Sequence, residues 1–352
     1  MKGDGNSPTR PVTSADVARA AGVSRATVSV ALSGREGSTR LGPETRARIQ
    51  EIARELGYTP HPAAVALRNR RTMRIVFVAR PARTEPHEQA IPYVLTTTAS
   101  RILSAHGYTT LVVQPEPLGN PRQLIDLILS NRAEGVLWDS PRAADQVEAI
   151  VDAGVPCVML MRPLSRVAGT TGAVVDPRPG VRAAIRHLAR LGHRRVAFIA
   201  QRGPHEVDLG RIDAFDEAVR AASIASDATV HLVDDYSIAA GYAATADCLA
   251  DGTTAVITSS DGLTLGVLRH LYDRRLRVPE AMSVVSFDDA AVAHLYPPVT
   301  SISQPFGAIA EQAVASLLDT LAGQRSPARV SLPTGLMVRG STGPAAAMAA
   351  GR

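Results

Sequence analysis

The stretch VTSADVARAAGVSRATVSVALSG, residues 12–34, contains two short segments with helical spacing on either side of a glycine. Thr13 or Ser14 can cap a first helix, and Gly22 can end it because glycine adopts a left-handed backbone without strain. Ser24 can cap a second helix after the turn. The apolar residues of the first segment share one helical face, namely Val17, Ala18 and Ala21. Two short helices joined by a tight turn predict a helix-turn-helix module.

The second helix has one side that can pack against the rest of the module and one side that can be exposed, which we call the presented side. The packing side holds Val28, Ala31 and Leu32, and the presented side holds Arg25, Ala26, Ser29, Val30 and Ser33. The N-terminal part of such a helix reaches base edges in the major groove. Arg25 suits a bidentate contact with guanine, Ser29 can bond a base or a phosphate, and Ala26 and Val30 offer only apolar contact with thymine methyl groups. The predicted DNA-binding residues of the module are Thr13, Ser24, Arg25, Ala26, Thr27, Ser29 and Val30.

A third helix is expected after the polar segment 33–42. Pro43 suits its first turn, where a missing N–H costs nothing, and Gly57 can end it. Its apolar residues recur at helical spacing, namely Ile49, Ile52, Ala53 and Leu56. The alternative to DNA binding is a three-helix bundle that merely has a solvated basic face. Salt-dependent binding to DNA distinguishes the two, because phosphate contacts release counterions.

The charge of the chain is concentrated near its N-terminus. Residues 1–72 contain 12 basic and six acidic residues, whereas the rest of the 352-residue chain contains 26 and 27. The formal net charge of +5 therefore comes entirely from the first fifth of the chain, as a basic module for phosphate would require. With 45% hydrophobic and 20% charged residues, the chain is not disordered throughout, collagen-like or a coiled coil.

From residue 74 onward, short β-rich runs alternate with helical ones. This alternation predicts βαβ units and parallel sheets covered on both faces. About 280 residues exceed the usual size of one such core, so we expect two α/β lobes with a cleft between them. The predicted strands are 75–79, 109–113, 135–138, 155–160, 195–200, 229–233, 255–258 and 283–287, and the predicted helices are 93–105, 121–131, 181–191, 209–221, 239–250 and 263–274.

Several classes of function lack their sequence signals. Cys157 and Cys248 stand alone, without CxxC or a Cys/His cluster, so no disulfide framework or metal site is expected. Without a signal peptide or an apolar run of membrane length, we expect a cytoplasmic protein that does not contact a membrane. Phosphate-binding, nucleophile and zinc-protease motifs are also missing, which favours a binding protein without a cofactor over an enzyme.

The run at 12–34 and the following PETRARIQEIARELGYTPHPAAVALRNRRT, residues 43–72, resemble the DNA-binding headpiece and hinge of the lactose-repressor (LacI/GalR) family. Later runs resemble that family's effector-binding core: ARLGHRRVAFIA (189–200), RIDAF (211–215), TAVITSSDGLTLGVL (254–268), RVPEAMSVVSFDD (277–289), PPVTSISQP (297–305) and VRGST (338–342). The resemblance implies a core like the type I periplasmic binding proteins. It divides the chain into an arm (1–11), a headpiece (12–60), a hinge helix and linker (61–72), a two-lobed effector-binding and dimerisation core (73–342) and a tail (343–352).

The resemblance also assigns roles to residues that contact DNA. Arg25, Ala26 and Val30 match the family's principal base-reading positions. Val30 stands where a polar or basic side chain is frequent, so the operator half-site should differ from the commonest ones. Leu67 matches the leucine that two subunits insert as a pair into the minor groove, where an apolar wedge kinks the duplex, and Arg68 follows as a minor-groove contact. The alternative for Leu67 is a helix residue packed on the headpiece.

In the core, the resemblance places Arg211 and Asp288 at effector-binding positions. A carboxylate accepts from hydroxyl groups and a guanidinium donates to them, so the pair suits a polyol. Tyr236 matches an aromatic position that can stack on a ring, and Ser260, beside Asp261, stands where asparagine is common. The alternatives are an ion pair between the lobes for Arg211, a capping role for Asp288 and a place in the ordinary core for Tyr236.

The resulting expectation is a homodimeric transcriptional regulator, most simply a repressor, that binds a palindromic operator. A small molecule between the lobes, expected to be a sugar, would change its affinity for double-stranded DNA. Whether that effector induces or co-represses is left open. The alternatives are a solute-binding protein and an α/β enzyme with an accessory DNA-binding module.

Overall fold

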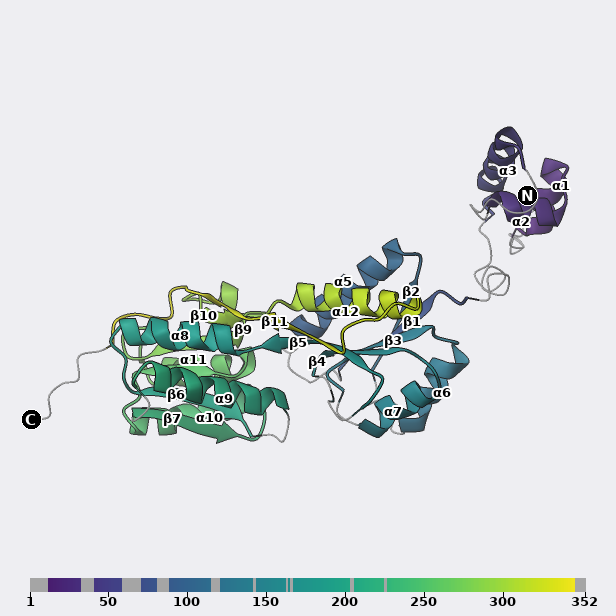
Figure 1. Cartoon of the computed structure of the whole chain (residues 1–352). Coiled ribbons are helices and arrows are strands. Elements are labelled where there is room, and N and C mark those ends of the chain that lie inside the picture. Colours follow the sequence, from purple (N-terminus) through teal and green to yellow (C-terminus); the bar gives the residue numbers. More distant parts are fainter. Residues whose placement is uncertain are drawn as a thin grey trace, which may run out of the picture. The chain divides into compact units, whose positions relative to one another are not determined.

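The computed structural model describes residues 12–32, 41–58, 71–80, 89–114, 121–141, 144–162, 164, 167–202, 206–224 and 227–345. The chain divides into two compact units, Met1–Thr72 and Met73–Arg352 (Figure 1). In the described residues, the first unit contains helices without strands, and the second unit consists of two α/β lobes.

The described part of the first unit has three helices around a small apolar core. The helices are α1 (Ser14–Ala21), α2 (Arg25–Leu32) and α3 (Pro43–Glu55), and the buried core residues are Val17, Ala18, Ala21, Val28, Ala31, Ile49 and Ala53. Helix α3 also caps its two neighbours. Arg48 Nη2 donates to the carbonyl oxygen of Ala21 at 2.5 Å, and Gln50 Nε2 donates to that of Ala31 at 3.3 Å. These bonds satisfy carbonyl groups that the ends of α1 and α2 leave without helical partners. The predicted helix-turn-helix is therefore confirmed.

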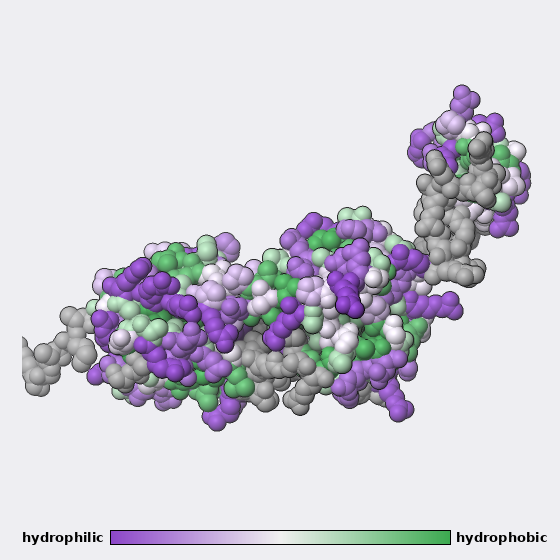
Figure 2. All heavy atoms as spheres, in the orientation of Figure 1, coloured by the Kyte–Doolittle hydropathy of each residue, from purple (hydrophilic) through white to green (hydrophobic). Residues whose placement is uncertain are grey.

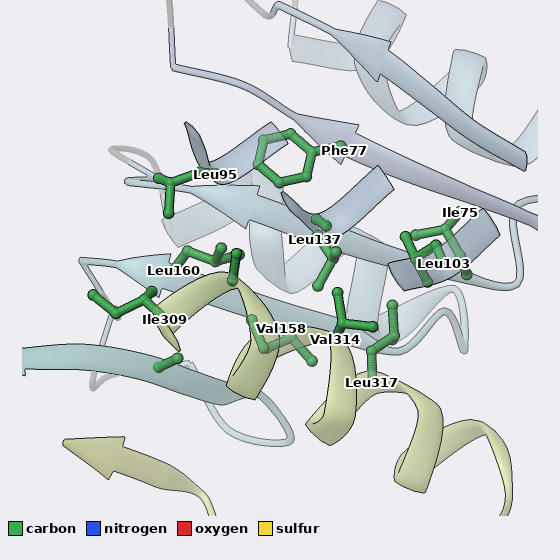
Figure 3. Close-up of a cluster of buried hydrophobic side chains, with 14 of the residues drawn as sticks. Ile75, Phe77, Leu95, Leu103, Leu137, Val158, Leu160, Ile309, Val314 and Leu317 are labelled. Carbon is green, nitrogen blue, oxygen red and sulfur yellow. The ribbon is translucent and has the colours of Figure 1, made fainter. Parts of the chain in front are cut away.

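The N-lobe of the second unit is built on a six-stranded sheet of order β11-β5-β4-β3-β1-β2, in which every pair is parallel. Its strands are β1 (Arg74–Val78), β2 (Thr109–Val113), β3 (Gly135–Asp139), β4 (Cys157–Met161), β5 (Thr171–Asp176) and β11 (Arg329–Pro333). Its helices are α5 (Ala90–Ala105), α6 (Pro121–Ser130), α7 (Ala144–Asp152) and α12 (Phe306–Leu321). Helices α5 and α12 share one apolar cluster with the sheet, where Ile309, Val314 and Leu317 lie against strand residues such as Leu137 and Val158 (Figure 3).

The C-lobe repeats this plan with a sheet of order β12-β10-β9-β8-β6-β7, parallel except for the β10–β12 pair. Its strands are β6 (Val196–Gln201), β7 (Ala228–Val233), β8 (Ala255–Thr258), β9 (Ser283–Asp288), β10 (Thr300–Ser303) and β12 (Gly335–Met337). Its helices are α8 (Arg178–Arg190), α9 (Glu206–Ala221), α10 (Ile238–Ala250), α11 (Asp261–Asp273) and the short 3₁₀ helix η4 (Val292–His294). Hydrophilic side chains predominate on the visible face of both lobes, with smaller apolar areas between them (Figure 2).

The chain passes between the lobes three times. It leaves the N-lobe from β5 to α8, returns from β10 to α12, and leaves again from β11 to β12. Helix α12 therefore completes the N-lobe although it follows C-lobe strands in the sequence (Figure 1). Two lobes joined by three such connections can move about them as a hinge.

All eight predicted strands and six predicted helices of the core are present, with small shifts at their ends. Val155 and Pro156 precede β4 rather than begin it, and Arg195 precedes β6. The elements of the core that were not predicted from the sequence are β5, α7, η4, β10, α12, β11 and β12.

Candidate functional site

The predicted DNA-binding residues of the first unit lie around the start of α1 and along α2. Thr13 donates to the carboxylate of Asp16 with its N–H at 2.9 Å and its hydroxyl at 2.6 Å. Ser24 Oγ accepts from the N–H of Thr27 at 3.1 Å and caps α2. Thr13 and Ser24 thus order the two helix starts, as their spacing predicted.

The described residues on the presented side of α2 are accessible as the pattern predicted, and Ser33 lies outside the described residues. Arg25 and Ala26 are exposed in the first turn, Ser29 and Val30 are half-exposed, and Val28 on the opposite side is fully buried. Leu67 and Arg68, the predicted minor-groove residues, lie outside the described residues. Within the described part, the candidate nucleic-acid interface is therefore the Arg25 end of α2.

A second candidate site lies where the parallel strands of both sheets end. The carboxyl ends of neighbouring parallel strands meet at one edge of a sheet, so the residues that follow them lie close together. Asp139 ends β3, Arg80 follows β1, Asp288 ends β9, Ser260 and Asp261 follow β8, and Gln304 follows β10. Arg211 reaches this edge from α9. We call Arg80, Asp139, Arg211, Asp261, Asp288 and Gln304 the interlobe cluster.

Arg211 and Asp288 form the buried centre of the C-lobe part of the cluster. Arg211 Nη2 lies 3.7 Å from Asp288 Oδ1, Arg211 Nη1 donates to the carbonyl oxygen of Ser259 at 2.6 Å, and the guanidinium lies 4.3 Å from the centroid of the Phe287 ring. Gln304 Nε2 donates to Asp288 Oδ1. Burial raises the pKa of Asp288, against the opposing charges of Arg211 and Arg80 and the hydrogen bond from Gln304. The alternative for Arg211, an ion pair between the lobes, does not describe its contact with Asp288, because both residues lie in the C-lobe.

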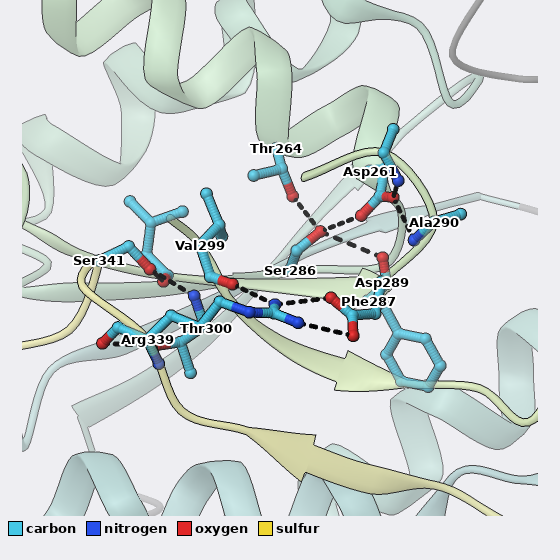
Figure 4. Close-up of polar contacts among 12 residues, drawn as sticks. Asp261, Thr264, Ser286, Phe287, Asp289, Ala290, Val299, Thr300, Arg339 and Ser341 are labelled. Atoms are coloured by element: carbon cyan, nitrogen blue, oxygen red, sulfur yellow. Dashed lines mark hydrogen bonds and ion pairs between the residues drawn. The ribbon is translucent and has the colours of Figure 1, made fainter. Parts of the chain in front are cut away.

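Asp261 orders the loop that carries Asp288. Its carboxylate accepts from Ser286 Oγ at 2.7 Å and from the N–H groups of Ala290 and Ala291 at 2.9 and 2.6 Å (Figure 4). Burial and the nearby charge of Asp288 raise the pKa of Asp261 to about 7, and these hydrogen bonds partly offset that rise. The protein itself uses both oxygens, so the geometry gives Asp261 a positioning role.

The adjacent aspartate points elsewhere. Asp289 forms a bidentate ion pair with Arg339, with N···O distances of 2.6 and 2.9 Å (Figure 4). Asp288 and Asp289 both have left-handed backbone, with φ of 93° and 64°, which turns their side chains to different partners. Ser260 Oγ accepts from the N–H of Leu263 at 3.3 Å and caps α11, at the position where, by the resemblance, asparagine is common in the family. Tyr236 is half-buried against the C-lobe core.

Three members of the cluster were not predicted from the sequence, namely Arg80, Asp139 and Gln304. Arg80 and Asp139 come from neighbouring strands 59 residues apart and form a bidentate ion pair, with Nε–Oδ2 at 2.7 Å and Nη2–Oδ1 at 2.9 Å. In each case, the signal available in the sequence was a polar residue at the end of a predominantly apolar strand. Among the described residues, Gln304 Oε1 and Ser259 Oγ are buried atoms without a hydrogen-bond partner. Such groups beside Asp288 and Arg211 fit a site that a polar molecule completes.

Two other kinds of site have no support in the described part of the chain. It contains no group of three or more His, Cys, Asp or Glu side chains arranged to hold a metal ion. None of its helices is both long enough and apolar enough to span a bilayer.

Comparison with known proteins assigns both units. Residues 13–61 match the model for bacterial regulatory proteins of the lacI family, and residues 185–342 match a periplasmic binding protein-like domain. The HTH-type transcriptional regulator CelR of Thermobifida fusca is 33% identical over 333 residues, covering 92% of this chain and 96% of CelR. The HTH-type transcriptional repressor CytR of Escherichia coli K12 is 30% identical over 335 residues, covering 93% of this chain and 95% of CytR.

Solved structures agree with this assignment. A CelR–cellobiose complex, 29% identical, matches with a TM-score of 0.67 over 94% of this chain and all of the other. The lac repressor dimer bound to operator and the anti-inducer ONPF, 24% identical, has the same fold, with a TM-score of 0.77 over 95% of this chain and all of the other. The relatives are regulators rather than enzymes, and the chain belongs to the LacI family of bacterial transcriptional regulators.

Proposed function

We propose that this regulator is a cytoplasmic repressor that binds a palindromic operator as a homodimer and changes its operator affinity when a neutral sugar binds between its lobes. Helix α2 enters the major groove, with Arg25 as its main base-reading residue. The basic charge of residues 1–72 supplies attraction to phosphate that does not depend on sequence. The Leu67 pair and Arg68 contact the minor groove between the two half-sites.

The short reading surface of α2 is the reason for a dimer. Of the four described residues on its presented side, Arg25, Ala26, Ser29 and Val30, two are polar and able to bond a base edge, namely Arg25 and Ser29. Each recognised base pair contributes about 1–3 kcal/mol, so a single headpiece discriminates poorly among the sites of a genome. Two copies on a two-fold axis double the contacts and require a palindromic operator.

The observation that carries the effector proposal is the buried group of Arg211, Asp288 and Gln304 at the edge where the strands of the sheets end. Asp288 can accept from hydroxyl groups, Arg211 can donate to them, and Gln304 Oε1 is a buried acceptor that no described residue uses. The cellobiose bound to CelR, a relative of this chain, supports a saccharide.

The charges of the interlobe cluster favour a neutral ligand. The formal charges of two guanidinium groups, Arg80 and Arg211, balance those of Asp139 and Asp288. The pKa of about 7 for Asp261 leaves that carboxyl partly protonated at neutral pH. A site without net positive charge has nothing to offset the desolvation of an anionic effector.

Binding to selected DNA tests the proposed function. We expect the full chain to enrich a palindromic duplex from a random library, and its log affinity for that duplex to fall steeply and linearly with log salt concentration. A neutral saccharide should change this affinity. Failure to enrich any duplex, or binding that no saccharide alters, would contradict the proposal.

A further inference from the structure

Strand β7 forms one edge of the C-lobe sheet. It pairs with β6 in parallel register, from Ala228 opposite Val196 to Val233 opposite Gln201 (Figure 1). In the described part of the chain, no strand pairs with its other side, which we call the free edge. The backbone N–H and C=O groups of the free edge can therefore pair with another strand. Six residues are the usual length of a strand, so the edge is long enough for such pairing.

The sequence of β7 does not protect this edge. Natural edge strands often carry proline or charged residues, which prevent unwanted pairing. The six residues ATVHLV contain no proline, lysine, arginine, aspartate or glutamate. Val230 and Leu232 are two residues apart, so they lie on the same face of the strand, and they are 37% and 43% exposed. Apolar residues of a neighbouring strand would cover these two side chains.

The other face of β7 borders an open groove beside helix α10. His231 and Val233 form the strand side of this groove, and Ala240, Ala243 and Asp247 lie on its helix side. Its volume is about 490 Å³. The alanine side chains are small, so the groove has room for the long side chains of a strand placed next to β7.

The groove is acidic. Residues 227–251 contain five aspartates and no lysine or arginine. Three of these aspartates line the groove, namely Asp234, Asp235 and Asp247. Asp234 lies 3.9 Å from Arg202, but the two side chains are 96% and 68% exposed, so this ion pair offsets little of the charge. The groove therefore attracts cationic side chains.

These charges distinguish between two kinds of partner. If β7 paired with β7 of a second copy, in either direction, the aspartates of both copies would come close together. Like charges on neighbouring strands are destabilising. An extended segment with basic residues has the opposite relation to the groove, because its cationic side chains approach Asp234 and Asp247.

We infer that the free edge of β7 binds an extended segment of a partner protein in which apolar residues alternate with arginine or lysine. Successive side chains of a strand point to opposite faces. The apolar residues of the segment lie beside Val230 and Leu232, and its basic residues lie in the groove near Asp234 and Asp247. Backbone hydrogen bonds to β7 supply affinity, and the two sets of side chains supply specificity. The contact uses none of the residues assigned to DNA binding or to the interlobe cluster, and it goes beyond the proposed function.

A synthetic peptide serves as the probe. It has eight residues of alternating arginine and valine and a fluorescent label, and anisotropy measures its binding to the full-length chain. In the comparison peptide, proline replaces one central valine and removes a backbone donor while the charge is unchanged. We expect wild type to bind the alternating peptide and to bind the proline peptide about threefold to tenfold more weakly, as for loss of a backbone hydrogen bond.

Two variants test the two faces of the strand. Leu232→Lys removes an apolar contact and adds a charge that repels a basic segment, so binding should be lost. Its matched control is Leu209→Lys, which adds the same charge at a 49% exposed leucine of α9 and should bind as wild type does.

For the groove, Asp234→Asn with Asp247→Asn should weaken binding by about twofold to thirtyfold, the range for two exposed ion pairs. The matched control is Asp213→Asn with Asp216→Asn, which removes the same charge from exposed positions of α9 and should leave binding unchanged. Equal effects of the two double variants would overturn the inference.

Hydrogen exchange shows whether the peptide pairs with the strand. The N–H groups of the free edge of β7 should exchange more slowly when the alternating peptide is bound. Binding without this protection, or equal binding of the two peptides, would show attraction by charge alone and overturn the inference, as would wild type that binds neither peptide. If wild type forms assemblies larger than a dimer in sedimentation and Leu232→Lys prevents them, the edge binds a second copy, which also overturns it.

Discussion

The backbone N–H of Gly180 donates to the hydroxyl of Thr334 at 2.9 Å, which joins the first connection between the lobes to the third. The same hydroxyl lies 3.0 Å from the carbonyl oxygen of Asp176 and 3.1 Å from that of Pro177. A Cβ on Gly180 would lie 2.5 Å from Ile302 Cγ2, at the second connection. All three connections are therefore packed together at one point, where any change in lobe arrangement must be accommodated.

A methyl group at this point should destabilise the core unit. Gly180→Ala places a Cβ 2.5 Å from Ile302 Cγ2 and 2.6 Å from Thr334 Oγ1, so we expect the free energy of unfolding to fall by about 1–3 kcal/mol. Chemical denaturation measures this. Gly307→Ala is the matched control, because Gly307 also lies in the first turn of a helix and has no atom within 4 Å of its added Cβ. Equal effects of the two substitutions would contradict the packing argument.

Substitution of Arg25 should change the sequence that the protein prefers. Arg25→Ala removes the exposed side chain suited to guanine, and we expect affinity for the selected duplex to fall by about 1–3 kcal/mol. Selection from a random duplex library should then show relaxed preference at one position in each half-site. Arg54→Ala, on the exposed side of α3, should weaken binding to all duplexes alike. An unchanged selected sequence for Arg25→Ala would exclude Arg25 as a base-reading residue.

The helical unit could be predicted from the sequence because its signals are local. Thr13, Gly22 and Ser24 each act within one turn of the helix end that they define, and the buried set of α1 and α2 follows from helical spacing alone. Of the predicted α3 residues, Ile49 and Ala53 are buried, whereas Leu56 is 39% exposed because it lies at the C-cap.

The α/β class of the core could be predicted from the sequence, but which of its elements pack together could not. Helix α12 has ordinary helical spacing, but nothing local indicates that it packs in the N-lobe, because it begins 145 residues after β4 ends. The short strands β10 and β12 depend on pairing across the sheet. The Arg80–Asp139 pair depends on the register of β1 against β3, which sequence spacing does not encode. Arg211 and Asp288 were found only through the family resemblance.

Titration of Asp261 should contribute to the pH dependence of the free energy of unfolding. Its folded pKa of about 7 lies above the ordinary 3.8, so between these values the folded state binds more protons than the unfolded state. The contribution of Asp261 to stability is therefore present below about pH 4 and is lost as pH rises towards 7. Between pH 4.5 and 7.5, which spans most of that window, the free energy of unfolding measured in urea should decrease less for Asp261→Asn than for wild type. Parallel pH profiles for variant and wild type would contradict the assignment.

His193 should produce the opposite dependence. It lies 1% exposed among Thr254 Oγ1, Ser283 Oγ and the carbonyl oxygen of Gly343. Burial lowers its pKa, against the favourable carbonyl of Gly343, so the folded state prefers the neutral ring. Its contribution to stability is complete above the ordinary pKa of 6.5 and is lost as pH falls from that value through the lower pKa of the folded state. Unfolding of His193→Gln should be less acid-sensitive than that of wild type over this range, and an equal sensitivity would exclude His193 as the titrating group.

The response of operator affinity to a saccharide tests the central claim most directly. Fluorescence anisotropy with the selected duplex should show that a neutral sugar changes the operator Kd of the wild-type chain by about fivefold or more, the usual size of coupling between two sites. Asp288→Asn should bind the duplex as wild type does without sugar and show no response to the sugar. An Asp288→Asn protein that responds as wild type does would contradict an effector site built on Arg211 and Asp288.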